Sequence, residues 1–318
     1  MKKKHSNFTQ ENSMTALIYY SFSLYLQAII HFSKGNTIIQ VMTQHLKLII
    51  LSIFTLSACH ISAQSLRKLM ERPFGVVESK WETNPQGGRE LNYYNEDYCD
   101  YYLYRMNDRS YNLTPGKNTI FKIEKNASFE NPFKSASSYR YYRGKFPKDF
   151  QIGIPYALPV KDGQKTGWQT DPREPVKTLN FHIKEGDTIY ATRSGVACTT
   201  ANPRQLLIYH PDQTFAAYLV MSENFIQPGE EVQVGQAIGK AGPLRVSISF
   251  FFLDENKFKG GESSGYPYSH FIPVFRTTQG DVKLKEKTIY QAVIDDELIT
   301  QDMSKRDKKK YMKHKNQK

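Results

Sequence analysis

The sequence contains very little cysteine, with three residues among 318. Cys59 lies in an N-terminal leader, so Cys99 and Cys198 are the two that remain in the rest of the chain. Two cysteines in different regions have neither the spacing of a disulfide framework nor that of a zinc-binding motif. In an oxidising compartment they are able to pair with each other, and the sequence leaves that pairing open.

Net charge is almost absent from the body of the chain. Of the formal +12, residues 305–318 contribute +7 and residues 1–63 contribute +4, which leaves +1 for residues 64–304. The pI near 9.3 therefore does not reflect a basic face that follows a phosphate backbone. We predict no nucleic-acid partner. The basic tail is either solvated or placed against an anionic surface, with solvation as the default.

An apolar run of transmembrane length is missing from the leader. After Lys47, residues 48–58 form an apolar stretch of about a dozen residues, shorter than the roughly 20 that cross a bilayer as a helix. The stretch is followed by small residues, which is the pattern of a secretory signal peptide over residues 42–63. We expect export across the inner membrane to the periplasm or the outer envelope.

Two processing schemes fit this leader. Cleavage after Ala63 suits ordinary signal peptidase, whereas residues 56–59 resemble a lipobox, in which Cys59 is lipidated and becomes a lipid anchor. That anchor would be the attachment to a membrane. Residues 1–41 precede a complete leader, and we interpret them as a mis-called extension before a true start at Met42, with an added membrane anchor as the alternative.

Helix-period stretches of useful length are absent from residues 64–148. The region is instead rich in tyrosine, and its β-prone runs are separated by turns that contain Pro and Gly. The runs are 91–95, 100–104, 119–123 and 138–142. Short strands at this spacing predict a small β-sandwich-like N-terminal domain.

Residues 149–290 also carry one β-prone run after another, with glycines at the turns. These runs are 188–191, 205–209, 214–220, 231–234 and 244–252. The pattern predicts a second all-β domain with tight corners. Residues 291–318 are predicted to form a short helix, around Asp295 to Met303, and then a lysine-rich tail.

The order of six short motifs resembles that of the lysostaphin-type, or LytM-type, zinc endopeptidases. The motifs are 186–191, 194–196, 207–214, 217–219, 227–232 and 234–242, and the resemblance covers about residues 149–275. It implies an antiparallel β-sheet groove of the hammerhead or barrel-sandwich type. Active members of the family cleave peptide cross-links in the bacterial cell wall with a zinc ion.

The resemblance also places the residues that such chemistry needs, and all of them are substituted. Counting from the glycine turns, the three zinc-ligand positions of the family fall on Val176, Asn180 and Ser249, and the two catalytic histidine positions fall on Tyr218 and Ser247. Valine has no donor atom, asparagine offers a neutral oxygen, and a serine hydroxyl is a poor zinc ligand at neutral pH. The resemblance therefore implies a degenerate member without zinc.

Two other histidines are candidate groove residues. His182 lies near the substituted Asp position, and His210 matches a histidine of the family's H-x-D-G hairpin that is not a zinc ligand. Together with Asp187 they are the candidate ligands of a relocated metal site, although their spacing matches no zinc signature. The sequence also lacks the G-x-S-x-G nucleophile motif and a phosphate-binding loop. The candidate groove residues are His182, His210, Tyr218, Ser247 and Ser249.

These observations favour a secreted envelope protein whose peptidase-like domain has lost zinc and catalysis and kept its groove. Its partner is then peptidoglycan or a cell-wall hydrolase that it regulates, and no cofactor is predicted. One alternative is an active zinc-dependent peptidoglycan endopeptidase with displaced ligands; a second is a structural envelope lipoprotein. The N-terminal domain either occludes the groove or extends it.

Overall fold

The computed structural model describes residues 66–105, 110–127, 139–148, 150–170, 178–243, 245–261 and 266–315. Residues Cys59–Lys318 form one compact unit. The predicted leader with Cys59, the stretch before Met42 and the aligned position Val176 lie outside the described residues. In the part that is described, no helix is long and apolar enough to cross a membrane.

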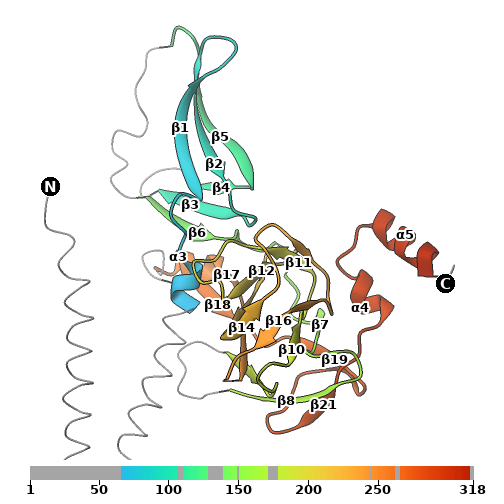
Figure 1. Ribbon diagram of the computed structural model, residues 1–318. Helices are drawn as coiled ribbons and strands as arrows, with labels where there is room; N and C mark the ends of the chain where they lie inside the picture. The colour runs from blue at the N-terminus through green and yellow to red at the C-terminus, as the bar shows by residue number, and fades with distance from the viewer. Residues whose placement is uncertain are drawn as a thin grey trace, which may run out of the picture. The chain divides into compact units, whose positions relative to one another are not determined.

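The N-terminal region forms two small antiparallel sheets (Figure 1). The first has the order β1-β2-β5, with β1 at Val77–Thr83, β2 at Arg89–Asn95 and β5 at Gly116–Ile123. The second has the order β4-β3-β6, with β3 at Tyr101–Arg105, β4 at Tyr111–Leu113 and β6 at Tyr139–Arg143. In β3 every second residue is buried, which is the period of a strand with one face on a core.

Residues 155–291 build three more sheets among the residues described. The largest has the order β15-β11-β12-β13-β17-β9-β8-β21, and β18 also pairs with β17. Its strands are β8 (Lys165–Gln169), β9 (Leu179–Phe181), β11 (Gly195–Ala197), β12 (Leu206–Tyr209), β13 (Phe215–Leu219), β15 (Glu231–Val232), β17 (Val246–Leu253), β18 (Tyr268–His270) and β21 (Ile289–Gln291).

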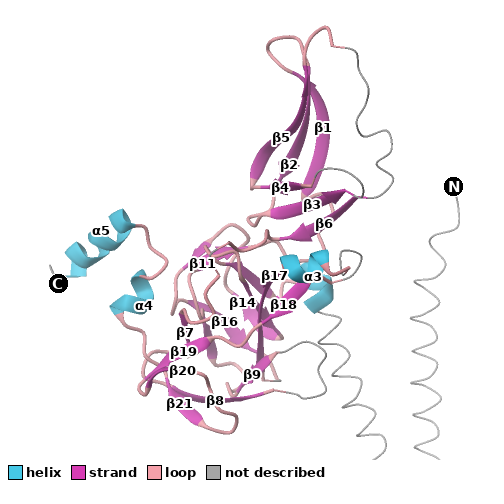
Figure 2. Ribbon diagram, turned by 180° about the vertical axis from the view of Figure 1, so that it is seen from behind, coloured by secondary structure: helices cyan, strands magenta, loops and turns pink. Residues whose placement is uncertain are grey.

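Two three-stranded sheets accompany it. One has the order β10-β16-β14, from β10 (Thr188–Tyr190), β14 (Met221–Asn224) and β16 (Ala237–Ala241). The other has the order β20-β19-β7, from β7 (Pro155–Ala157), β19 (Val274–Thr277) and β20 (Gly280–Val282). The β7–β19 pair is parallel. Figure 2 shows how strands dominate the described chain and how short its helices are, which confirms the predicted all-β class.

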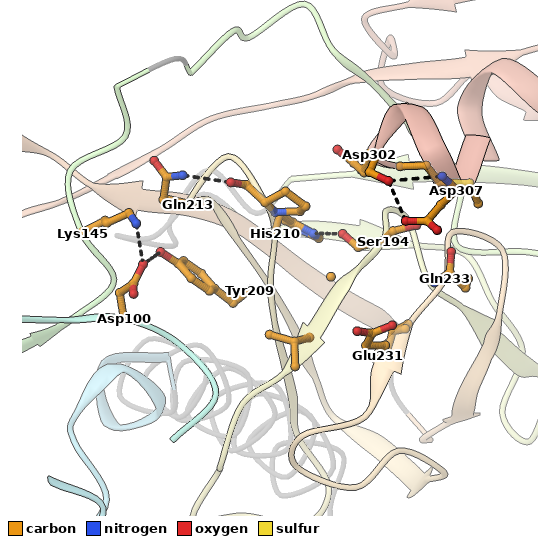
Figure 3. A pocket seen from close by; sticks show the side chains of 16 residues that line it. Asp100, Lys145, Ser194, Tyr209, His210, Gln213, Glu231, Gln233, Asp302 and Asp307 are labelled. Carbon is orange, nitrogen blue, oxygen red and sulfur yellow. Dashed lines mark hydrogen bonds and ion pairs between the residues drawn. The ribbon is translucent and has the colours of Figure 1, made fainter. Parts of the chain in front are cut away.

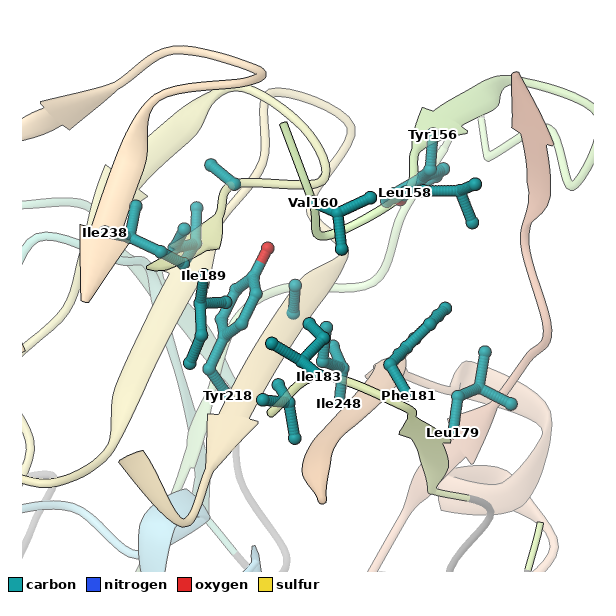
Figure 4. Close-up of a cluster of buried hydrophobic side chains, with 14 of the residues drawn as sticks. Tyr156, Leu158, Val160, Leu179, Phe181, Ile183, Ile189, Tyr218, Ile238 and Ile248 are labelled. Atoms are coloured by element: carbon teal, nitrogen blue, oxygen red, sulfur yellow. The ribbon is translucent and has the colours of Figure 1, made fainter. Parts of the chain in front are cut away.

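Strand β17 shows why the largest sheet is buried on both faces. Val246, Ile248 and Phe250 point into one hydrophobic core, which also contains Tyr156, Phe181 and Tyr218 (Figure 4). Alternate residues point to the other face, where Phe251 and Leu253 belong to a second core. Because successive side chains of a strand point to opposite faces, this run of hydrophobic residues serves two cores at once.

The C-terminal region is helical. The short helix α4 (Asp296–Thr300) matches the predicted position, and Asp295 caps it by accepting from the Leu298 N–H at 2.9 Å. The lysine-rich tail, predicted as part of a helical C-terminal region over residues 291–318, contains a second helix, α5 (Lys305–Lys315). Ser304 caps its start, since the Asp307 backbone N–H donates to the Ser304 hydroxyl at 3.2 Å, and that hydroxyl donates to the Asp307 carboxylate at 2.6 Å. One further short helix, α3 (Glu255–Lys259), follows β17.

A buried arginine joins the N-terminal sheets to the largest sheet. The Arg143 guanidinium lies 3.2 Å from the Asp97 carboxylate, and both side chains are fully buried. The same group donates to the carbonyl oxygen of Leu69 at 3.2 Å and to that of Thr199 at 2.5 Å. Next to it, Gly144 has φ 87°, and a Cβ there would lie 2.8 Å from the Phe215 ring. A larger residue at 144 would separate the two parts.

We expect Arg143→Met to lower the free energy of unfolding by about 3–5 kcal/mol, because it leaves the buried Asp97 carboxylate without its counter-charge. Urea unfolding followed by fluorescence measures this loss. The control is Lys122→Met, which removes an ion pair to Glu90 whose lysine is largely exposed, so it should have little effect. Equal losses in the two variants would contradict a special contribution from the buried pair.

Candidate functional site

Two of the aligned family positions meet on adjacent strands. Asn180 on β9 is the register partner of Ser247 on β17. The Ser247 hydroxyl donates to the Asn180 side-chain oxygen at 2.5 Å. The structure thus brings together the position of a zinc-binding aspartate and that of a catalytic histidine, but the two side chains now satisfy each other.

Ser249, two residues along β17, is on the same face and fully buried. Its hydroxyl oxygen lies 3.0 Å from Nδ1 of His270 on the neighbouring strand β18. Ser247 is only 8% exposed. Both serine side chains are therefore largely inaccessible to solvent.

The residues present at the family's metal position do not fit zinc. A neutral amide oxygen and a serine hydroxyl replace a carboxylate and an imidazole, and both already have hydrogen-bond partners within the protein. Catalytic zinc needs three protein ligands that are good donors and one open position for water. Neither condition is met by Asn180 and Ser249.

Tyr218 points away from these residues. Its register partner is Ile248, so its side chain lies on the opposite face of the sheet from Ser247 and Ser249. The phenol oxygen accepts from the Thr192 N–H at 2.8 Å and lies 2.8 Å from the Thr192 hydroxyl. Burial raises the pKa of Tyr218 to about 12. The structure therefore places Tyr218, a candidate groove residue, away from the two serines, and at neutral pH its phenol stays protonated in the core.

The structure does not gather the relocated metal site either. The side chain of His182 is exposed just beyond the end of β9, and the backbone N–H of this residue donates to the Gly167 carbonyl at 2.9 Å. His210 is buried after β12. Within the described ranges, the one group of at least three His, Cys, Asp or Glu ligand atoms close enough to share an ion is Asp97, Cys99 and Cys198. His182, Asp187 and His210 form no such group.

The N-terminal region covers the face of the sheet that carries Ser247 and Ser249. Its residues Tyr101 and Leu103 share one hydrophobic core with Phe251. Polar contacts fix this arrangement: the Tyr209 hydroxyl donates to the Asp100 carboxylate at 2.8 Å, and the Thr199 N–H donates to Asp97 at 2.8 Å. These contacts place the N-terminal region on the same face of the sheet beside Phe251 and Tyr209.

A pocket of about 470 Å³ opens elsewhere, at the edge formed by β11, β12 and β15 (Figure 3). Its lining carries four carboxylates and one ammonium group. The residues concerned are Asp100, Glu231, Asp302, Asp307 and Lys145. Lys145 lies 3.0 Å from Asp100, Arg193 holds Asp302 and Lys310 lies 3.6 Å from Asp307, which leaves Glu231 as the lining carboxylate without a counter-charge among the described residues. Such a pocket favours a ligand that carries positive charge.

Arg193 holds one wall of this pocket in place. Its buried guanidinium donates to both carboxylate oxygens of Asp302, at 2.8 and 2.9 Å, and to Asp212 at 2.6 Å. It also donates to the Tyr156 hydroxyl at 3.1 Å. Because a bidentate pair fixes direction as well as distance, Arg193 positions the segment between α4 and α5 against the sheet.

His210 lies beneath the pocket in an environment that keeps it neutral. Its Nδ1 donates to the Ser194 carbonyl at 2.8 Å, and its Nε2 is buried with no hydrogen-bond partner among the residues described. Burial and then the nearby Arg193 charge lower the pKa of His210 to about 4. The imidazole is therefore uncharged near neutral pH.

Sequence reasoning missed Arg193, Asp302 and Asp100. Arg193 directly precedes the Ser194-Gly195-Val196 motif, and an arginine inside a run of strand residues is a signal for a buried ion pair. Asp100 and Asp302 carried no comparable signal, because each meets its partner across more than 100 residues of sequence.

Comparisons with known proteins give distant similarities. No family model and no curated protein matches this chain. Among solved structures, it is similar to pseudoalterin, an M23 metalloprotease from the deep sea, with 14% identity over 34% of this chain and 69% of the other, and a TM-score of 0.23. A Pseudomonas aeruginosa protein assigned to peptidase M23 gives 11% identity, 53% and 69% coverage and a TM-score of 0.27.

Csd3 of Helicobacter pylori gives 12% identity over 74% of this chain and 58% of its own length, with a TM-score of 0.26. The first two of these structures are M23 proteins by description. At such TM-scores the similarity carries no argument about activity.

We expect the free energy of unfolding to fall by roughly 3 kcal/mol as the pH is lowered from 6.5 to 4, because the unfolded state binds a proton at His210 in this range and the folded state does not. Below pH 4 both states are protonated at this site, and its contribution stops changing. Urea unfolding at several pH values measures the slope.

His210→Asn should flatten the slope between pH 6.5 and 4, whatever its absolute stability. His182→Asn is the matched control, because this histidine is exposed and should leave the slope unchanged. An unchanged slope in His210→Asn would show that other groups cause the acid sensitivity.

Proposed function

We propose that this chain is a secreted cell-envelope protein whose peptidase-like domain works by binding and not by hydrolysis. The observation that carries the proposal is the state of the aligned metal position. Asn180 and Ser247 are hydrogen-bonded to each other, and Ser249 is buried next to His270. A face in this state offers no open coordination position for a metal-bound water.

Because Ser247 and Ser249 are buried, the acidic pocket is the more accessible candidate for a ligand site. The pocket volume of about 470 Å³ is typical of small-ligand sites. Its exposed carboxylate Glu231 has no ion pair among the described residues, whereas Asp302 is held by Arg193. We propose that it takes the free amino group of a peptidoglycan stem peptide, since an ammonium group and a carboxylate are complementary.

A cell-wall hydrolase is the second partner that the proposal allows. Regulation of such an enzyme needs no catalysis by this chain, so the same loss of metal ligands supports it. Capture of a hydrolase without binding of purified peptidoglycan would identify this partner in place of stem peptides. A lipid anchor at Cys59 is compatible with either partner.

We expect the purified chain to hold no stoichiometric zinc after equilibration with zinc and desalting, and to leave cross-linked muropeptides uncut, because the ligand positions carry Asn180 and Ser249. Plasma emission spectrometry and chromatography of the muropeptides measure the two quantities. About one zinc per chain together with cleavage would overturn the proposal and support the displaced-ligand enzyme.

We expect the chain to sediment with purified peptidoglycan, and Glu231→Arg to weaken this binding about tenfold, which corresponds to about 1.4 kcal/mol. The reversed charge repels the ligand ammonium group. Glu185→Arg is the control, because Glu185 is equally exposed and does not line the pocket. Equal binding by the two variants would exclude this pocket as the site.

A further inference from the structure

Cys99 and Cys198 come from different parts of the chain and meet inside the protein. Cys99 lies just before β3 in the N-terminal region, and Cys198 follows β11 of the largest sheet. Both are buried, at 0% and 2% exposure, in the hydrophobic core that joins the two parts. Their sulfur atoms lie within 4.8 Å of each other and of an Asp97 carboxylate oxygen.

The backbone on each side of the two cysteines is fixed. The Cys198 N–H donates to the Leu207 carbonyl at 2.8 Å within the sheet. The Asn95 side chain donates to the Cys99 carbonyl at 2.9 Å. Between these two anchors, the Thr199 N–H donates to Asp97 at 2.8 Å, so the two segments are tied within two residues of each cysteine. The thiols therefore face each other persistently, and not through chance approach.

A metal ion is a poor explanation for this cluster. The Asp97 oxygens already accept from the Tyr98 N–H, the Thr199 N–H and the Tyr101 hydroxyl. The Arg143 guanidinium, 3.2 Å away, supplies the positive charge that balances this carboxylate. A divalent cation would have to displace these donors and lie beside a buried arginine. The two thiols, in contrast, have only weak contacts, to Asp97 at 3.6 Å and to the Val196 carbonyl at 3.9 Å.

We propose that Cys99 and Cys198 are the two halves of a disulfide bond that fastens the N-terminal sheets to the largest sheet. The inference is independent of the proposed binding function, because it concerns how the N-terminal sheets stay attached to the largest sheet. Formation requires rotation of the two side chains, which brings the sulfurs to the bonded distance of about 2 Å.

The reaction consumes a disulfide-bearing oxidant, either a protein thiol oxidant or oxidised glutathione. The thiolate of one cysteine attacks the oxidant's disulfide and releases one thiol, and the other cysteine's thiolate then attacks the mixed disulfide and releases the second. Two protons and two electrons leave the cysteine pair, and the oxidant is reduced to two thiols. Burial raises the pKa of the Cys99 thiol, which disfavours the attacking thiolate in the folded protein. We therefore expect the two cysteines to be oxidised during folding, before this core excludes the oxidant.

The bond would close a loop of about 100 residues, which is in the range where cross-linking restricts the unfolded chain most. It would therefore stabilise the closed arrangement without any new contact in the folded state. Reduction of the folded protein should be slow, since the reductant has to reach a buried bond.

The test is thiol labelling of the full chain carrying Cys59→Ser, which leaves only the two cysteines of interest. The protein is refolded in a glutathione redox buffer, denatured in guanidinium chloride with EDTA, labelled with a maleimide and weighed by mass spectrometry. We expect no label without reductant and two labels after dithiothreitol. A tryptic peptide pair joined through Cys99 and Cys198 should be present only in the oxidised sample.

Stability gives a second measurement. Reduction should lower the Tm of the Cys59→Ser chain by about 5–10 °C. The matched control, Cys59→Ser with Cys99→Ala and Cys198→Ala, should show no change with dithiothreitol. Two labels in the refolded, unreduced sample would overturn the proposal. Two labels there combined with one zinc per native chain would assign the cluster to a metal instead. The labelling result stands even if the alanine variant fails to fold.

Discussion

The ion pair between Arg143 and Asp97 is the interaction on which the arrangement of the two β regions depends. Two fully buried opposite charges are stable only if every remaining donor and acceptor is satisfied. Asp97 meets this condition by accepting from Thr199 in the largest sheet, and Arg143 by donating to Thr199 and Leu69. The pair therefore requires the N-terminal sheets, the helical turn at residues 66–70 and the largest sheet to be in place together.

This dependence bears on the chemistry of the chain. In a hydrolytic groove, the sheet face that carries metal ligands has to admit both substrate and water. Here that face is a packing surface, and Ser249 is as inaccessible as a core phenylalanine. Small hydroxyl side chains at 247 and 249 fit such a surface, whereas imidazoles would need space and hydration. The small side chains at the aligned positions and the burial of this face are thus consistent with the proposed binding role.

The sequence predicted the strands well wherever β-branched and aromatic residues ran between glycine turns, as in β12, β13 and β17. The sequence did not show on which face of the sheet Tyr218 lies. Counting along a motif does not fix the face, because a shift of one residue in strand register moves a side chain to the opposite face. The acidic pocket and the proximity of the two cysteines could not be predicted from the sequence, because each depends on contacts between segments that are distant along the chain.

The pairing of β7 with β19 and of β8 with β21 has a consequence for how the protein is made. In each pair the partners come from opposite ends of the second region. The strand that is synthesised first therefore stays without this partner until the last part of the region has been made. Such non-local pairing slows folding, because the chain entropy of a long loop is lost before any contact forms. Until β21 arrives, β8 presents an unpaired edge that is open to other chains. A chain of this topology therefore benefits from a chaperone that shields the early strands during synthesis.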